Sequence, residues 1–250
     1  MGDKIALVTG AAGGIGAEVC RQLAATGHRV AVCDVNQEAG AALAQEIDGH
    51  FIACDVSDFD AMTRAVDACV ANLGVPDVVH LNAGVMTVPN DAPYLAIESV
   101  TLAQYHRMTG INLDGVFHGF KTLIPLMKAR GGVITVTASI AGFSAMDIDP
   151  LYGLSKWGLI GFVRAVGAAN AATALRINAI CPGVVDTQIV PEVFRAAGVT
   201  GMPPAVMATE ILDLMAHGAA GEIRVKMSAD QPAFVVAMQD LQALQAAAAV

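Results

Sequence analysis

Short apolar runs alternate with stretches of helical periodicity along most of the chain. The first run, Lys4 to Thr9, is apolar from Ile5 to Val8 and predicts a buried strand. The segment Ala17 to Thr26 follows, with Val19, Leu23 and Ala24 on one helical face. The same alternation predicts further strands at Arg29 to Val35, Phe51 to Asp55, Asp77 to Asn82, Val133 to Ser139, Arg176 to Cys181 and Glu222 to Met227. Further helices are predicted at Gln37 to Ile47, Phe59 to Leu73, Leu102 to Arg130 (bent or broken near Gly110 and Gly115) and Tyr152 to Ala174.

Strands that alternate with helices imply parallel pairing and right-handed crossovers. We therefore expect an α/β fold, a Rossmann-type doubly wound parallel sheet of about seven strands with helices on both faces. No Pro/Gly/Ser-rich linker interrupts the alternation, so we expect residues 1–250 to form a single domain. Ligands bind beyond the carboxyl ends of the strands in such sheets. Five polar or turn-forming residues lie at or just after predicted strand ends: Asp34, Asp55, Asn82, Ser139 and Pro182.

Composition narrows the function classes. Apolar residues make up 55% of the chain, enough for a core on both faces of a sheet. The net charge of -9 argues against a nucleic-acid partner. No signal peptide and no apolar run of about 18 residues is evident, so we expect a cytoplasmic protein without a membrane partner. The five scattered cysteines are expected to pack as small hydrophobes, and His106, His118 and His217 lack ligand spacing, so no catalytic metal is expected. The low-complexity tail, Ala246 to Ala249, is expected to fray.

A glycine-rich loop, Gly10 to Gly16, joins the first strand to the first helix. Glycine lets the backbone reach positive φ and approach a pyrophosphate closely, and the helix N-terminus favours an anion. The spacing is Gly-x-x-x-Gly-x-Gly at Gly10, Gly14 and Gly16, rather than the common Gly-x-Gly-x-x-Gly. The pattern predicts a phosphate cradle, with a plain tight turn as the alternative.

Asp34 ends the second predicted strand, eighteen residues after Gly16. A carboxylate at this place can accept hydrogen bonds from both ribose hydroxyls of an adenosine and repels a 2′-phosphate. No arginine or lysine lies in the glycine loop or just after Asp34. These features favour NAD over NADP, while a strand-end capping residue is the alternative for Asp34.

Tyr152 and Lys156 are one helical turn apart, and Ser139 lies thirteen residues before Tyr152. Residues at i and i+4 project from one face of a helix. A cation beside a phenol favours the phenolate, so Lys156 is expected to lower the pKa of Tyr152 below its ordinary value of about 10. The pair is a candidate acid/base device for an alcohol oxygen. Tyr-x-x-x-Lys alone can also arise by chance on any helix.

These motifs, in this order and spacing, resemble the short-chain dehydrogenase/reductase family, in its NAD-dependent branch of chains of about this length. The resemblance runs from Lys4 to about Thr187. Its markers are Thr9-Gly-x-x-x-Gly-x-Gly16, Asp55-Val56, Asn82-Ala83-Gly84, Asn112, Ser139, Tyr152-x-x-x-Lys156 and Pro182-Gly183.

The resemblance implies roles for four catalytic residues. Tyr152 would be the general acid/base on the substrate oxygen, and Lys156 would lower its pKa and hold the nicotinamide ribose. Ser139 would donate a hydrogen bond to the same oxygen as charge develops there. Asn112 would hold a water that links the lysine to solvent; from the residues alone, an exposed helical asparagine is the alternative.

The resemblance also implies a set of cofactor contacts. It comprises Gly10, Gly14, Ile15, Gly16, Asp34, Val35, Asp55, Val56, Asn82, Ala83, Gly84, Tyr152, Lys156, Pro182, Gly183, Val185 and Thr187. Asp55 and Val56 would meet the adenine ring, and Asn82 to Gly84 would brace the adenosine side. Pro182 to Val185 and Thr187 would meet the nicotinamide end.

Two segments are expected to line a substrate pocket, Ile140 to Leu151 and Ile189 to about Met207. They offer Phe143, Met146, Ile148, Ile189, Val190, Phe194 and Met202, each of which has ordinary core packing as its alternative. With few cations among them, an apolar secondary alcohol or ketone fits better than a sugar phosphate. Glu222 to Ala229 departs from the Val-Asp-Gly-Gly-like turn of many relatives, which puts their usual tetramer in doubt.

Two functions remain open at this level. The first is an NAD-dependent alcohol dehydrogenase or ketone reductase that acts on a small, hydrophobic substrate. The second is a dinucleotide-binding sensor or scaffold without turnover. The small and apolar residues of Leu102 to Arg130 and Tyr152 to Ala174 predict a homo-dimer or homo-tetramer packed on these helices, with Gly115, Gly119, Gly158, Gly161 and Ala165 among them.

Overall fold

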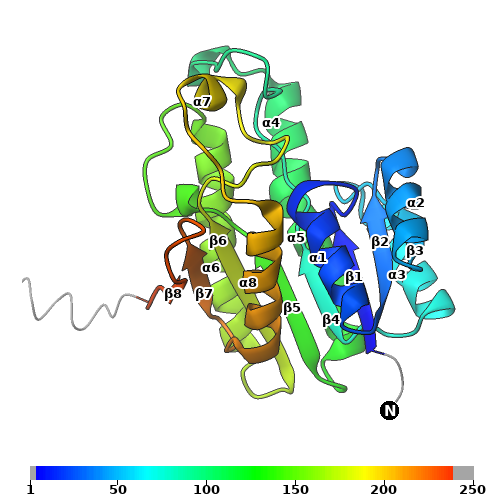
Figure 1. Cartoon of the computed structure of the whole chain (residues 1–250). Helices are drawn as coiled ribbons and strands as arrows, with labels where there is room; N and C mark the ends of the chain where they lie inside the picture. The colour runs from blue at the N-terminus through cyan, green and yellow to red at the C-terminus, as the bar shows by residue number, and fades with distance from the viewer. Residues whose placement is uncertain (1–3, 239–250) are drawn as a thin grey trace, which may run out of the picture.

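A mostly parallel sheet of eight strands runs through residues 4–238, the part of the chain that this computed structural model describes (Figure 1). The strand order is β3-β2-β1-β4-β5-β6-β7-β8. Strands β1 to β7 pair in parallel, and β8 is antiparallel to β7. The strands are β1 (Lys4–Thr9), β2 (His28–Asp34), β3 (His50–Ala53), β4 (Val78–Leu81), β5 (Gly132–Thr137), β6 (Leu175–Pro182), β7 (Ile223–Lys226) and β8 (Phe234–Val235).

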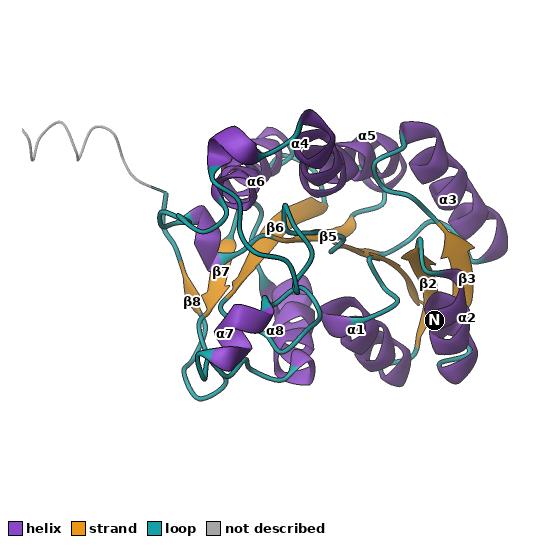
Figure 2. Cartoon of the chain, turned by 90° about the horizontal axis from the view of Figure 1, so that it is seen from above, coloured by secondary structure: helices purple, strands orange, loops and turns teal. Residues whose placement is uncertain are grey.

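Helices cover both faces of this sheet, which confirms the doubly wound arrangement (Figure 2). The helices are α1 (Gly14–Ala25), α2 (Gln37–Glu46), α3 (Phe59–Asn72), α4 (Leu102–Thr109), α5 (Gly115–Met127), α6 (Pro150–Ala169), α7 (Glu192–Ala196) and α8 (Pro204–His217). Viewed from above, α3 to α6 lie on one side of the strands, and α1, α2 and α8 lie on the other. Two buried apolar clusters, one under each helical layer, form the core.

The sheet has one strand more than the sequence pattern predicts. The additional strand, β8, has two exposed residues, Phe234 and Val235, and is too short to show an alternation of its own. It follows the segment Glu222 to Ala229, where the sequence departs from the usual C-terminal turn, and it extends the sheet beyond β7. The predicted low-complexity tail lies outside the described residues.

Two helices differ from their predicted extents. Helix α8 was not predicted, although Met207, Ile211 and Leu214 form a buried helical stripe that begins just after Pro204. Helix α6 starts at Pro150 rather than Tyr152, because a proline suits the first turn of a helix and Asp149 caps it. It ends at Ala169, five residues before the predicted Ala174, and Asn170 is its C-cap.

The predicted break in Leu102 to Arg130 is confirmed. A π-helical turn, Gly110–Asp114, separates α4 from α5. Single π-helical turns inside helices are frequent at functional sites because they re-aim side chains. Here the turn carries Asn112, which is 1% exposed.

All five cysteines are buried and free, which confirms their expected packing role. Within residues 4–238, no helix is both long enough and apolar enough to cross a membrane.

Candidate active site

A cavity of about 970 Å³ opens beyond the carboxyl ends of the strands. The glycine loop, the ends of β2, β4, β5 and β6, helix α6 and the segment around α7 surround it. The predicted site residues that line it are Gly10, Gly14, Ile15, Asp34, Asn82, Ala83, Gly84, Ser139, Tyr152, Lys156, Pro182, Gly183, Val185 and Thr187. Five predicted residues lie outside its lining: Gly16, Val35, Asp55, Val56 and Asn112.

The glycine loop needs glycine for space as well as for conformation. Gly10 and Gly14 have φ of 61° and 53°, which L side chains rarely adopt. A Cβ on Gly10 would lie 2.7 Å from the Ala83 Cα, and one on Gly16 would lie 2.1 Å from the Gly10 carbonyl oxygen. Gly16 therefore serves packing between the loop and α1.

The N-terminus of α1 faces this cavity and suits an anion. Its N-cap is Gly13, no side chain caps it, and its first turn holds no acidic residue. The first backbone N–H groups of a helix are unpaired within the helix and carry its positive dipole end. The loop and helix together thus fit the phosphates of a dinucleotide.

Asp34 lies at the end of β2, beside this loop. Its Oδ2 accepts a hydrogen bond from the Ala12 N–H at 2.8 Å, and its Oδ1 accepts one from the Asn36 N–H at 2.9 Å. The carboxylate thus holds the glycine loop and still lines the cavity. Both interpretations of Asp34, capping and ligand contact, are compatible with this geometry.

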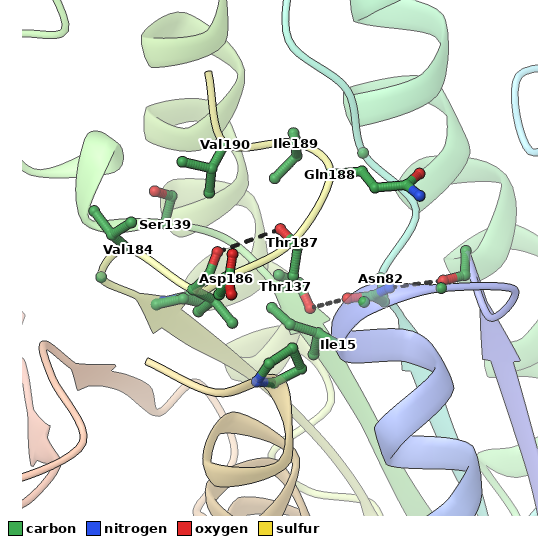
Figure 3. A pocket seen from close by; sticks show the side chains of 18 of the residues that line it. Ile15, Asn82, Thr137, Ser139, Val184, Asp186, Thr187, Gln188, Ile189 and Val190 are labelled. Atoms are coloured by element: carbon green, nitrogen blue, oxygen red, sulfur yellow. Dashed lines mark hydrogen bonds between the residues drawn. The ribbon is translucent and has the colours of Figure 1, made fainter. Parts of the chain in front are cut away.

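Asn82 braces the loop from the other side. Its Nδ2 donates to the Gly10 carbonyl oxygen at 3.1 Å, and its Oδ1 accepts from the Thr137 hydroxyl at 3.0 Å. Figure 3 shows Asn82 between Thr137 and the glycine-loop side of the cavity, with Ile15 on the first turn of α1 nearby.

Ser139 and Tyr152 reach the cavity from different elements. Ser139 follows β5 and starts a short 3₁₀ turn, where its Oγ accepts from the Ala141 N–H at 3.1 Å. Tyr152 is in the first turn of α6. Burial raises the pKa of Tyr152 to about 12, and the neighbouring Ser139 hydroxyl opposes that rise. The expectation that the pKa of Tyr152 falls below 10 is therefore wrong for the protein in this state.

Lys156 lies one turn further along α6 and is 3% exposed. Its Nζ donates to the Thr137 carbonyl oxygen at 3.0 Å and lies 5.4 Å from the centre of the Tyr152 ring. Burial lowers the pKa of Lys156 to about 8, so the ammonium form still predominates at neutral pH.

Asn112 is buried behind this lysine rather than exposed on a helix. Its Oδ1 accepts from the Val85 N–H at 2.8 Å, and its Nδ2 donates to the Val85 carbonyl oxygen at 2.9 Å and to the Ser155 hydroxyl at 3.1 Å. A Cβ on Gly84 would lie 3.5 Å from Asn112 Oδ1 and 3.6 Å from Lys156 Nζ. Gly84 thus marks the place where these two side chains converge.

Val35, Asp55 and Val56 have other surroundings. Val35 is 66% exposed. Asp55 accepts from the Ser57 N–H at 2.9 Å and from the Ser57 hydroxyl at 2.7 Å, in the turn before α3. Val56 is buried and packs against Gly115. Their contact with a bound cofactor stays a prediction.

The segment after β6 closes the opposite wall. A Cβ on Gly183 would lie 2.2 Å from the Met227 carbonyl oxygen, so the chain can pass β7 only with glycine there. The Thr187 methyl carbon lies close to the glycine loop, 3.0 Å from a Cβ placed on Gly14. In Figure 3, Thr187, Gln188, Ile189 and Val190 follow one another along this wall.

The apolar wall is only partly the predicted one. Met146, Ile189, Val190 and Phe194 line the cavity. Met202 is instead buried in the core beneath α8, and Phe143 packs against the other core cluster. Ile148 lines a separate small cavity beside Tyr94.

Sequence reasoning missed several polar residues of the lining, and three of them have contacts that bear on the site. Thr137 holds Lys156 through its backbone oxygen, which no side-chain motif can announce. Arg21 lies one turn beyond the glycine loop, and its guanidinium pairs with Glu18 at 2.6 Å and with Glu46 at 2.7 Å. Arg195 of α7 donates to the Thr187 carbonyl oxygen at 2.6 Å. For Arg21 and Arg195, the only sequence signal is a positive charge in a segment that was already expected to lie near the site.

The arrangement can bind an anion at the glycine loop and exchange a proton between a hydroxyl-bearing substrate and the Ser139, Tyr152 and Lys156 group. Among residues 4–238, no group of three or more His, Cys, Asp and Glu side chains is placed to hold a metal ion.

Comparisons with known proteins identify a family that this chain resembles over most of its length. Residues 4–198 match the model of the short chain dehydrogenase family. The trans-4-hydroxycyclohexanecarboxylate dehydrogenase of Sinomonas cyclohexanicum is 32% identical, over 88% of this chain and 87% of that protein. The NAD(+)-dependent 2-dehydro-3-deoxy-L-rhamnonate dehydrogenase of a Sphingomonas species is 34% identical, over 76% and 75%. Among solved structures, an actinorhodin polyketide ketoreductase with NADPH superposes with a TM-score of 0.82 at 26% identity, over 90% of this chain and 96% of that one.

Proposed function

The chain belongs to the short-chain dehydrogenase family, and from that premise we propose that it transfers a hydride between NAD(H) and a secondary alcohol or ketone with an apolar body. Membership makes it an oxidoreductase that acts on a hydroxyl group or a ketone. The choice of NAD and of an apolar substrate are our additions. The observation that carries the proposal is the convergence of Ser139, Tyr152 and Lys156 in one cavity with the glycine loop.

NAD is favoured by the charges around the adenosine side. Asp34 lines the cavity there, and a carboxylate repels a 2′-phosphate. Arg21 is the cation closest in sequence to the glycine loop, but Glu18 and Glu46 already occupy its guanidinium. A 2′-phosphate would have to compete with these two carboxylates for the N–H groups of the Arg21 guanidinium. The similarity to an NAD(+)-dependent relative points the same way, whereas the ketoreductase structure contains NADPH.

In this proposal the nicotinamide cofactor supplies the hydride chemistry, and the protein positions and protonates. Tyr152 takes the proton from the substrate hydroxyl during oxidation and returns it during reduction. Ser139 donates a hydrogen bond to the same oxygen, and Lys156 stabilises the phenolate by its charge. The Thr137 carbonyl oxygen accepts a hydrogen bond from Lys156 and holds it in place. Asn112 holds the same helix through the Ser155 hydroxyl.

The wall beside Ser139 favours an apolar substrate. Met146, Ile189, Val190 and Phe194 line it, and a hydrophobic lining with few polar groups is typical of pockets that bury most of a small ligand. Among the relatives, the trans-4-hydroxycyclohexanecarboxylate dehydrogenase is compatible with a ring that carries the reacting hydroxyl, whereas the rhamnonate relative acts on a sugar acid, so the choice of an apolar substrate rests on the lining.

A sensor or scaffold that binds NAD without turnover is the other candidate. A lysine could hold a ribose in such a protein, but a protein without turnover has no need of a serine hydroxyl and a phenol beside that lysine. The intact set of Asn112, Ser139, Tyr152 and Lys156 therefore favours an enzyme.

A substrate panel tests the proposal. NAD and NADP would each be offered with apolar secondary alcohols, and NADH and NADPH with the matching ketones, while absorbance of the reduced cofactor is followed. We expect turnover with NAD(H) and the apolar members. Tight NAD binding with no turnover across the panel would favour the sensor.

We also propose a homo-dimer or homo-tetramer packed on the α5 and α6 side. Phe117, Leu154 and Trp157 are 49%, 51% and 54% exposed there. Gly115 and Gly119 do not contribute, since they pack inward against Val56 and Leu81. Light scattering at micromolar concentration tests this proposal, and a monomer would refute it.

A further inference from the structure

A buried carboxylate lies three residues before Tyr152, outside the set of residues assigned to the chemistry. Asp149 is 3% exposed and caps α6, where its Oδ1 accepts from the Tyr152 N–H at 3.0 Å. The same Oδ1 accepts from the Thr87 hydroxyl at 2.6 Å, and Oδ2 accepts from the Thr87 N–H at 2.9 Å. Thr87 is itself 5% exposed. The carboxylate thus ties the backbone of the catalytic helix to a segment that is 62 residues away in sequence.

A second chain of hydrogen bonds links the Tyr152 carbonyl oxygen to the same segment. The Ser155 hydroxyl donates to the Tyr152 carbonyl oxygen at 2.8 Å and accepts from Asn112. Asn112 in turn holds Val85 through both its N–H and its carbonyl group. The two routes meet on Val85 to Thr87, and Met86 between them lines the active-site cavity.

We propose that Asp149 is a positioning residue for the reaction, which holds the backbone of Tyr152 to the Val85–Thr87 wall of the cavity. The inference rests on the proposed function, because it assumes that Tyr152 moves the proton. Side chains of Tyr94, Ile97, Ile148 and Leu151 line a small cavity with Thr87 and Asp149, so the carboxylate lies in apolar surroundings. No cation pairs with it among the described residues, and Thr87 with the helix N-terminus supplies its partners.

Electrostatics supports a role beyond capping. After burial, the negative charge of Asp149 contributes to the raised pKa of Tyr152. A carboxylate at this place acts on the phenol through space whether or not it positions Tyr152. The titration of Tyr152 therefore reports the charge of Asp149, and kcat reports the position of Tyr152.

Asp149→Asn is the first test. The amide keeps an acceptor for the Tyr152 N–H and the Thr87 hydroxyl, but it turns an NH₂ toward the Thr87 N–H and removes the charge. Asp147→Asn is the matched control, because Asp147 is exposed two residues earlier and carries the same charge. Tyrosinate absorbance would be titrated in each protein, and the curve of the same protein with Tyr152→Phe added would be subtracted to isolate Tyr152 from the other two of the three tyrosines. The added substitution is needed in each background because the charge of Asp149 also raises the pKa of Tyr94.

We expect the Tyr152 midpoint to fall to lower pH in Asp149→Asn and to stay in place in Asp147→Asn. We also expect kcat to fall by about 10-fold or more in Asp149→Asn, because small displacements of a reacting group are costly, with cofactor affinity unchanged. An unmoved midpoint with wild-type kcat would overturn the proposal, as would equal effects in both variants. The titration needs no substrate, so a wild-type protein that turns over no alcohol would sink the proposed function and leave this arm readable.

Thr87 provides a second pair of variants if Asp149→Asn does not fold. Thr87→Val removes the hydroxyl donor and keeps the N–H, whereas Thr87→Ser keeps both. We expect a lower kcat with unchanged cofactor affinity in Thr87→Val and recovery in Thr87→Ser. Equal kcat in the two variants would overturn the link between Thr87, Asp149 and Tyr152.

Discussion

The Lys156 ammonium lies 5.4 Å from the centre of the Tyr152 ring. Both side chains are buried, and burial shifts their pKa values in opposite directions. Burial raises the pKa of Tyr152 to about 12 and lowers that of Lys156 to about 8. Burial thus favours the neutral form of each group, whereas a charge on either favours the opposite charge on the other. A change in the burial or the charge around the pair should therefore shift the pKa of both Tyr152 and Lys156.

Tyr152→Phe should abolish turnover and leave NAD binding largely intact. The substitution removes the proposed proton carrier but keeps the ring and its packing. Rates and cofactor titrations on the same preparation provide the measurement, and Tyr105→Phe on the exposed face of α4 is the control. Near-normal turnover in Tyr152→Phe would show that the phenol is not the acid/base, even if the fold is as described.

Ser139→Ala should lower kcat by about 10² to 10³, the usual cost of losing one donor to a developing oxyanion. The Ser139 hydroxyl also opposes the raised pKa of Tyr152, so its loss removes that contribution as well. Ser144→Ala is a matched control, since Ser144 lines the same cavity and its side chain has no assigned role. A variant with wild-type kcat and a raised KM alone would reassign Ser139 to ground-state binding.

Asp34→Asn combined with Val35→Arg should shift preference toward NADP by at least about 10-fold in the ratio of dissociation constants, because a charge repulsion is replaced by a cation. Asparagine keeps an acceptor for only one of the Ala12 and Asn36 N–H groups, because each donates to a different oxygen of Asp34. Val35 is exposed enough to carry the longer side chain. Asp34→Asn alone serves as the control and should relax the preference without inverting it. A wild-type protein that binds NADP as tightly as NAD would contradict the premise.

The sequence predicted the strands that carry the site because they are near-continuous apolar runs, as buried parallel strands require. The glycine loop and the Tyr152 to Lys156 spacing could also be predicted, because each is a short sequence pattern whose physical cause lies within the same few residues. The break in Leu102 to Arg130 was predicted from Gly110 and Gly115, and the structure adds that it is a π-helical turn.

Contacts between residues far apart in the sequence could not be predicted in this way. The hydrogen bond from Lys156 to the Thr137 carbonyl oxygen and the bond from the Thr87 N–H to Asp149 depend on backbone groups that almost every residue possesses. The direction of the Tyr152 pKa was misjudged for a related reason. The motif reveals the neighbouring cation, whereas burial, which dominates, is a property of the whole fold.

His80 gives a prediction about stability rather than catalysis. It is fully buried in β4, with Nδ1 3.2 Å from the Thr135 carbonyl oxygen and Nε2 3.1 Å from the Thr137 hydroxyl. Burial lowers the pKa of His80 to about 4, and the hydrogen bond to Thr135 opposes that fall. The folded protein therefore keeps His80 neutral at pH values where the unfolded chain, with a pKa near 6.5, binds a proton.

Because the unfolded chain binds more protons between these two pKa values, the protein should lose stability as pH falls from about 6.5 toward 4. The His80 contribution to that loss should be about 2 kcal/mol between pH 7 and pH 5. His80→Asn should be less stable than wild type at pH 7, since it cannot reach both partners, but the gap in free energy of unfolding should narrow by about that amount at pH 5. Denaturant unfolding at both pH values measures the gap, with His106→Asn, an exposed histidine, as the control that should leave the pH dependence as it is. A gap of constant size would mean that His80 binds a proton as readily in the folded protein as in the unfolded chain, and the lowered pKa described here would be incorrect.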